Sequence, residues 1–218
     1  MLTGRCLFVS DIHGQVDAFA RLLAAMRYEP GQDRLVLLGD YVGVQGENVR
    51  CLRTIQDLCA AGATALVGNH DLALLECLTS AGAAAALSST YAYIQALAAE
   101  VARDMPDLAP FLRRLPLWYE DEDFIAVHAG FNPDLADWRA STRDEFTTMR
   151  EPFLSRTLDL RRTVIFGHTP CERLHGSPGI YFGQGKIGID GGAGHGQQIN
   201  GLAFDGQRYA VHAVAVRS

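Results

Sequence analysis

The sequence lacks the cysteine pattern of a disulfide framework or of a thiolate metal site. Its five cysteines are scattered over 218 residues, and none of them forms a CxxC pair. Disulfide-stabilised extracellular domains carry cysteines in even sets, so an odd, scattered set indicates a reducing compartment and buried free thiols.

Segments for export or membrane insertion are also missing. The chain passes from Met1–Arg5 directly into an apolar, strand-like run, which argues against a secretory signal. It contains no run of 18 apolar residues, the length that a membrane-spanning helix requires. Together with the cysteine usage, these absences predict a cytoplasmic protein with no membrane partner.

The sequence has fewer basic than acidic residues, and its net charge is −6. Broad nucleic-acid binding is therefore not expected, whereas two bound divalent cations would offset part of the negative charge locally. No repeat, linker or low-complexity tail divides the sequence, so residues 1–218 are expected to form a single domain.

Apolar strand-like runs alternate with amphipathic helical patterns in the first third of the chain. Strands are predicted at 6–10, 34–38 and 64–67, and helices at 16–26 and 47–61. This alternation predicts an α/β fold whose parallel strands are joined by right-handed crossovers.

The region of about 71–114 is rich in alanine and is predicted to form a helical cap. The cap is either a scaffold that packs on the sheet, which we favour, or a lid that shapes access to a site. Further strands are predicted at 117–120, 124–127 and 163–166, helices over 133–160, and short strands around a turn at 205–207.

Polar residues follow the predicted strands at the points where those strands end. The segments are Asp11-Ile12-His13-Gly14, Gly39-Asp40, Gly68-Asn69-His70-Asp71, His128-Ala129-Gly130 and Gly167-His168. Each is a weak signal alone, because a Gly-Asp pair is a common turn and a lone histidine is more often structural. Their succession indicates one site built from several strand ends. Imidazole with carboxylate suits zinc, manganese or iron better than calcium.

These DxHG, GD, GNH, HAG and GHTP segments together resemble the motifs of the calcineurin-like binuclear metallophosphoesterases. Within that family they are similar to the phosphoprotein phosphatase branch, which includes bacterial serine/threonine phosphatases and symmetrical diadenosine tetraphosphatases. The resemblance spans Val9 to about Gly194. It implies an α/β (by some schemes α+β) sandwich of two mixed β-sheets flanked by helices. It also implies two divalent metal ions, with manganese favoured and iron, zinc or nickel as alternatives.

Position by position, the resemblance implies roles for particular residues. The implied metal ligands are Asp11, His13, Asp40, Asn69, His128 and His168, with Asp40 bridging the two ions. His70 would be the general acid that protonates the leaving oxygen, and Arg150 would clamp the phosphate. Asp71, where the family usually has glutamate, is assigned no function. The segment from Gly188 to Gly194 is expected to form a loop at the rim of the site, and for His195 a surface position is favoured over a contact with substrate.

The sequence departs from the family pattern within the second motif, after Asp40. The family pattern there is GDxVDRG, but Gly43 and Val44 stand where the family has aspartate and arginine. In the family that aspartate partners the acidic histidine and that arginine contacts phosphate, so His70 is expected to lack its partner. Arg50 is a candidate substrate-binding replacement for the arginine, whereas Arg53 is expected to be a solvated helix charge.

The resemblance implies hydrolysis of phosphate monoesters by metal-activated hydroxide, as in a serine/threonine phosphoprotein phosphatase. An alternative is hydrolysis of a dinucleoside polyphosphate, whose acidic leaving group needs less help from His70. A third hypothesis is a weakened relative that only binds phosphate. It is less favoured, because buried carboxylates without metal are costly. The expected partner is a phosphorylated substrate: a phosphoprotein, a small phosphate ester or a dinucleoside polyphosphate.

Overall fold

The computed structural model describes residues 4–80 and 92–216, and these residues form two mixed five-stranded β-sheets. In strand order, the first sheet is β10 (Tyr209–Ala215), β9 (Gln198–Phe204), β1 (Cys6–Val9), β2 (Arg34–Leu37) and β3 (Thr64–Ala65). The second is β4 (Trp118–Glu120), β5 (Phe124–Val127), β6 (Thr163–Phe166), β8 (Lys186–Gly188) and β7 (Tyr181–Phe182). The predicted sandwich of two mixed sheets is therefore confirmed.

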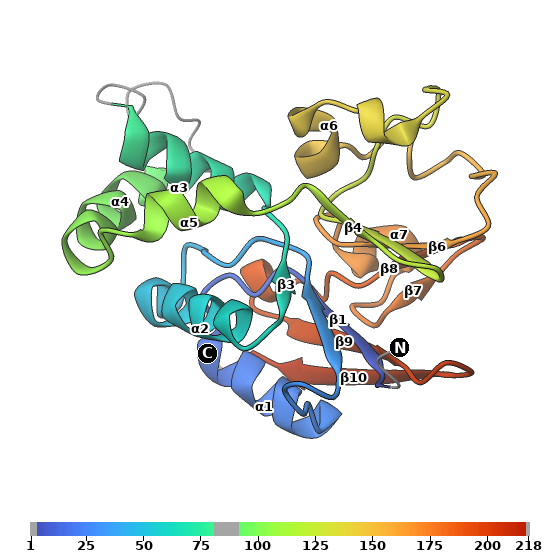
Figure 1. Cartoon of the computed structure of the whole chain (residues 1–218), viewed down its shortest axis with the longest axis horizontal. Helices are drawn as coiled ribbons and strands as arrows, with labels where there is room; N and C mark the ends of the chain where they lie inside the picture. Colours follow the sequence, from blue (N-terminus) through green and yellow to red (C-terminus); the bar gives the residue numbers. More distant parts are fainter. Residues whose placement is uncertain (1–3, 81–91, 217–218) are drawn as a thin grey trace.

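Helices flank both sheets (Figure 1). They are α1 (Val16–Met26), α2 (Asn48–Ala60), α3 (Asn69–Thr79), α4 (Ala92–Asp104), α5 (Leu108–Arg114), α6 (Arg143–Thr148) and α7 (Cys171–His175). Helices α3, α4 and α5 gather on one side as the predicted cap, whereas α1 packs along β9 and β10. None of the helices in the described ranges is long and apolar enough to cross a membrane.

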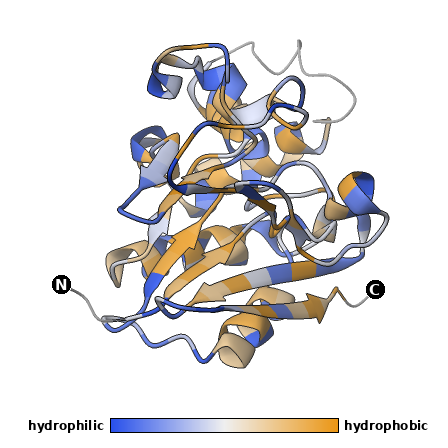
Figure 2. Ribbon diagram, turned by 90° about the vertical axis from the view of Figure 1, so that its right-hand side faces the viewer, coloured by the Kyte–Doolittle hydropathy of each residue, from blue (hydrophilic) through white to orange (hydrophobic). Residues whose placement is uncertain are grey.

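Alternation of side chains along the strands separates the core into layers. On β1, Phe8 points between the two sheets, where its ring meets Phe124 of β5 edge to face at 5.1 Å. Its neighbours Leu7 and Val9 point to the opposite face, into the cluster formed with the helices. Figure 2 shows the resulting concentration of hydrophobic residues on the central strands.

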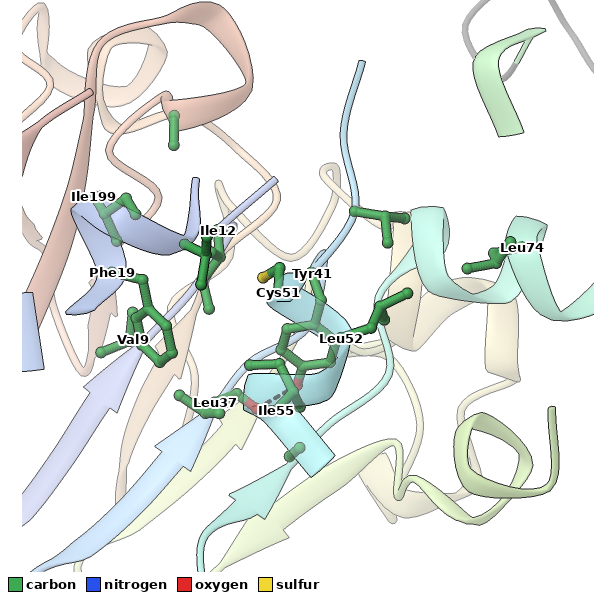
Figure 3. Packing of buried hydrophobic residues seen from close by; sticks show 14 of the residues in the cluster. Val9, Ile12, Phe19, Leu37, Tyr41, Cys51, Leu52, Ile55, Leu74 and Ile199 are labelled. Atoms are coloured by element: carbon green, nitrogen blue, oxygen red, sulfur yellow. Dashed lines mark hydrogen bonds between the residues drawn. The ribbon is translucent and has the colours of Figure 1, made fainter. Parts of the chain in front are cut away.

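The loop after β2 is anchored by Tyr41, whose ring is buried against Cys51, Leu52 and other residues of α2 (Figure 3). Its hydroxyl donates a hydrogen bond to Leu66 O at 2.6 Å, which ties this loop to the segment after β3. A buried tyrosine needs such a partner for its hydroxyl. The anchor holds the neighbouring residue, Asp40, at the end of the strand.

Most predicted elements are confirmed within one or two residues, but the helix expected over 133–160 is wrong. Only a 3₁₀ turn at Trp138–Ala140 and α6 are helical there. Asp137 and Thr142 accept hydrogen bonds from nearby backbone N–H groups, and such local bonds compete with a continuous helix. The alanine-rich stretch 81–87, predicted to be helical, lies outside the described residues.

Lys186 fixes the segment after α6, which carries Arg150. Its buried amine donates hydrogen bonds to Phe153 O at 2.6 Å, Leu154 O at 2.9 Å and Arg156 O at 2.7 Å. The ammonium also lies 5.0 Å from the centre of the Phe153 ring. Burial lowers the pKa of this amine, and the carbonyls compensate for its lost hydration.

Lys186→Met should therefore lower the free energy of unfolding by about 2–4 kcal/mol, because three backbone carbonyls lose their donor. Urea unfolding would measure the loss. Arg208→Met is the matched control: it removes the same charge from an exposed turn and should change stability by less than about 0.5 kcal/mol. Equal losses in the two variants would contradict this account.

Candidate metal centre

The ends of strands from both sheets meet at one cavity of about 620 Å³. Parallel pairing of β1, β2 and β3, and of β5 with β6, brings the carboxyl ends of these strands to the same side. The predicted site residues that line the cavity are Asp11, His13, Asp40, Asn69, His70, Arg150 and His168. His128, also a predicted ligand, is fully buried behind them and contacts Asn69.

Four of the predicted ligands have strained backbones. The φ angles of Asp11, His13, Asp40 and His168 are +53°, +48°, +56° and +61°. Residues with a Cβ atom avoid this left-handed region, at a cost of about 1–3 kcal/mol each. Such strain clusters at functional sites, where the surrounding structure fixes side-chain direction at the expense of local stability.

Asp71 ties the two central loops of the site together. Its fully buried carboxylate accepts hydrogen bonds from the backbone N–H groups of Asp40 at 2.8 Å, Tyr41 at 3.0 Å and Gly68 at 2.9 Å. At Gly68 a Cβ atom would lie 2.1 Å from Asp40 Oδ1, so only glycine allows this close approach. Asp71, to which the sequence alone assigns no function, thus joins the loop after β2 to the start of α3.

Two of the histidines present one ring nitrogen to acidic neighbours. The Nδ1 of His13 donates to Val42 O at 3.0 Å, and the Nδ1 of His128 donates to Leu38 O at 2.8 Å. Backbone hydrogen bonds of this kind orient metal-binding imidazoles. They leave each Nε2 facing oxygen atoms.

The oxygen atoms around these nitrogens are acceptors. His13 Nε2 lies 3.9 Å from both Asp11 Oδ1 and Asp40 Oδ2. His128 Nε2 lies 3.0 Å from Asn69 Oδ1 and 3.5 Å from Asp40 Oδ1. Burial alone would lower the pKa of His128, but Asp40 and Asp11 raise it. A positive charge, from a proton or a metal ion, is therefore favoured at this point.

His168 supplies a further free ring nitrogen. Within the described part of the chain, its buried Nε2 has no hydrogen-bond partner. Burial, with His128 nearby, lowers the pKa of His168 to about 3, so the ring is in the neutral form that binds metals. Its backbone N–H donates to Asp11 Oδ2 at 3.0 Å, which fixes the ring beside the other candidate ligands.

The donor set fits two cations that share one carboxylate. Ligand atoms of Asp40, His128 and His168 lie within 4.8 Å of one another, and so do those of His13, Asp40 and His70, the last of which is the candidate acid and not one of the predicted ligands. Asp40 belongs to both groups. The orphaned nitrogen of His168 and the nitrogen-to-oxygen contacts of His13 and His128 are what a bound cation would satisfy.

Buried carboxylates give the centre a strong need for positive charge. Burial raises the pKa of Asp11 to about 6 and, with Asp11 nearby, the pKa of Asp190 to about 8. At Asp40 burial acts in the same direction, but the surrounding imidazoles, led by His128, outweigh it and lower the pKa. Acids raised this far indicate a site that is completed by cations.

One predicted substrate contact, Arg50, lies away from the cavity. Arg50 is exposed, pairs with Asp17 at 2.9 Å and Glu47 at 3.0 Å, and is not among the described residues that line the cavity. The first turn of α2 directs it to the surface. Arg150 does line the cavity, and its guanidinium reaches His168 O at 3.5 Å.

Other lining residues were missed or underrated from the sequence. Arg173 of α7 and Asp190 both line the cavity, as does His195, for which a surface position was favoured over a contact with substrate. The signal for Arg173 was Pro170, because proline is common at the start of helices. Pro170 directly precedes the short helix α7, and this helix brings Arg173 back toward the site.

Comparison with known proteins identifies relatives of this arrangement. The model of the calcineurin-like phosphoesterase family matches residues 4–192. A symmetrical bis(5'-nucleosyl)-tetraphosphatase from Actinobacillus succinogenes is 32% identical over 148 residues, which cover 66% of this chain and 51% of that protein. The chain thus spans about half the length of this curated relative.

Solved structures show the same fold. A protein provisionally named a diadenosine tetraphosphatase superposes with a TM-score of 0.75 at 25% identity, covering 98% of this chain and 95% of that one. The cold-active protein-tyrosine phosphatase of a psychrophilic Shewanella species superposes with a TM-score of 0.65 at 16% identity, covering 98% and 80%. The latter is a likeness of fold alone.

Manganese should raise the melting temperature of the purified protein relative to the same protein in EDTA. At a hundredfold excess over Kd, one ion adds about 2.7 kcal/mol, which corresponds to roughly 5–10 °C for a chain of this size. Asp40→Asn should abolish most of the gain. Asp134→Asn, which removes an exposed carboxylate paired with Arg156, should keep it. An unchanged gain in Asp40→Asn would contradict the assignment.

Proposed function

The chain belongs to the calcineurin-like phosphoesterase family, and on that premise we propose that it is a two-metal hydrolase of dinucleoside polyphosphates. The substrate class is that of diadenosine tetraphosphate. This proposal reverses the preference drawn from the sequence, which placed phosphate monoesters first. The names of the relatives support the anhydride, since tetraphosphatases stand among both the sequence relatives and the solved structures.

The observation that carries the proposal is a second cavity beside the candidate metal centre. It has a volume of about 390 Å³ and shares Arg150 and Arg173 with the first cavity. Two guanidinium groups between adjoining cavities suit a run of phosphates longer than a single phosphoryl group.

The lining of the second cavity suits a nucleoside. Leu154, Phe166, Leu174 and Tyr181 supply apolar and aromatic surface, and Ser155 and Thr169 supply hydroxyls. Nucleobases are bound by stacking and by a few polar contacts, which this lining offers. A single phosphoryl group would leave this space unfilled.

We assign the residues of the centre as follows. Asp11, His13, Asp40, Asn69, His128 and His168 hold the two metal ions. When bound, the ions polarise the phosphoryl oxygens and lower the pKa of the attacking water. Manganese stays the expected metal, with iron, zinc or nickel as alternatives.

Arg150 and Arg173 bind the phosphate chain and hold the reacting phosphorus in line for attack. Water adds to one of the two central phosphorus atoms, and the bond to the bridging oxygen breaks. A dinucleoside tetraphosphate thus yields two nucleoside diphosphates. The departing diphosphate is a weak base, so it needs little protonation by His70 as it leaves.

Turnover of diadenosine tetraphosphate should exceed turnover of a serine phosphopeptide by at least about tenfold in kcat/KM, because the phosphopeptide brings no nucleoside to the second cavity. Anion-exchange analysis of the products should give ADP alone. Asp40→Asn should reduce both activities to background. Faster release of phosphate from the phosphopeptide would overturn the substrate assignment while leaving the metal centre intact.

Arg150→Ala should lower kcat/KM for diadenosine tetraphosphate by about a hundredfold, the effect of losing one charged donor to phosphate. Arg50→Ala is the matched control. It removes the same group from a surface ion pair, so kcat/KM should stay within about twofold. Comparable losses from the two substitutions would show that Arg150 does not contact the substrate.

A further inference from the structure

The cap helix α4 places a tyrosine against the candidate acid of the site. The hydroxyl oxygen of Tyr93 lies 2.7 Å from Nδ1 of His70. We propose that Tyr93 is the positioning residue of His70: it fixes the ring so that the opposite nitrogen faces the substrate. The inference rests on the proposed function for its kinetic consequence, but not for its geometry.

The Tyr93 hydroxyl has a second partner beside His70. It donates to Val42 O at 3.3 Å, and by this proposal its oxygen accepts the proton on His70 Nδ1. Val42 O also accepts the Nδ1–H of His13. One carbonyl therefore links the orientation of a candidate metal ligand to that of the candidate acid.

With Nδ1 held by Tyr93, the other nitrogen of His70 is directed to the reacting centre. His70 Nε2 lies 3.8 Å from Asp40 Oδ2, and the residue lines the larger cavity. The His70 ring also packs edge to face on His13, with centroids 4.9 Å apart. These contacts orient the ring toward the candidate metal centre.

Residue 43 cannot provide this partner. A Cβ atom on Gly43 would lie 2.6 Å from the Cβ of His13 and 2.8 Å from its carbonyl oxygen. The Gly43 backbone is held in place by Asn48, whose side-chain amide binds its N–H and its C=O, each at 2.9 Å. A carboxylate at this position would displace His13, so the partner of His70 comes from another element.

Helix α4 holds the hydroxyl firmly. Ile94, Leu97 and Val101 of α4 are buried in the core cluster, and Tyr93 itself packs against that cluster. The cap was expected to be either a scaffold or a lid. By this inference it also supplies a side chain to the reaction centre.

Tyrosine differs from carboxylate in one respect that matters for the substrate. A neutral hydroxyl orients the imidazole but adds no negative charge to favour its protonated form. The Tyr93 contact therefore fixes the direction of the His70 ring without promoting its protonation. Such an arrangement suits a diphosphate leaving group, which needs little protonation, better than an alkoxide.

A spectroscopic test addresses the geometry without reference to activity. Histidine-labelled (¹⁵N) full-length protein, loaded with diamagnetic zinc, should show His70 protonated at Nδ1 with a slowly exchanging proton. His70→Asn assigns the signal. Tyr93→Phe should abolish the slow exchange. Tyr119→Phe is the matched control: it removes a part-buried hydroxyl that donates to Asp121 at 2.8 Å, and it should leave the signal unchanged.

Kinetics then test the role. Tyr93→Phe should lower kcat about tenfold for phenyl phosphate, whose leaving group needs a proton, and less than about twofold for p-nitrophenyl phosphate, with KM unchanged for both. In a His70→Asn background, Tyr93→Phe should have no further effect, because the two residues act as one unit.

The outcomes separate the two proposals. An unchanged His70 signal in Tyr93→Phe, or equal losses on the two esters, overturns the positioning role and leaves the proposed function standing. A wild-type protein with no turnover of any phosphate compound overturns the proposed function, while the His70 signal still decides the role of Tyr93.

Discussion

The centre depends on the hydrogen bonds by which the carboxylates of Asp40 and Asp71 join the loop after β2 to the start of α3. Asp71 accepts the backbone N–H groups of Asp40 and Tyr41, and Asp40 Oδ1 accepts the N–H of His70. The loop after β2 and the start of α3 are thereby locked together over 30 residues of sequence. Asn69 and His70 take their positions from this lock.

The fold holds the residues of the centre in place, although their backbone strain and their buried negative charge destabilise it. Strained backbones at Asp11, His13, Asp40 and His168 and a buried group of carboxylates both oppose folding. The sandwich core, the Tyr41 anchor and the hydrogen bonds of Lys186 offset these terms. The protein thus holds its donors in place in advance, so little conformational entropy remains to be lost when cations bind.

Sequence motifs predicted which candidate ligands would lie together, because each motif lies at the end of its own strand, where local spacing fixes direction. Residues placed by distant packing escaped prediction. Arg50 was expected at the substrate but follows the outer face of α2, and Tyr93 reaches His70 only through the docking of α4 on the core. The segment 133–160 misled for a related reason, since its apolar residues serve a separate cluster that includes Trp138 and Phe153, without helical periodicity.

Lys186 is the only lysine of the sequence, and its amine is enclosed by three backbone carbonyls. Every other strongly basic side chain is arginine, whose guanidinium keeps its charge up to about pH 12 or beyond. Acetylation, ubiquitination and amine-directed cross-linking therefore find no lysine on the native surface. Reaction of Lys186 with an acylating reagent would therefore require local opening of the segment that carries Arg150. The rate of that reaction would measure how often this segment opens.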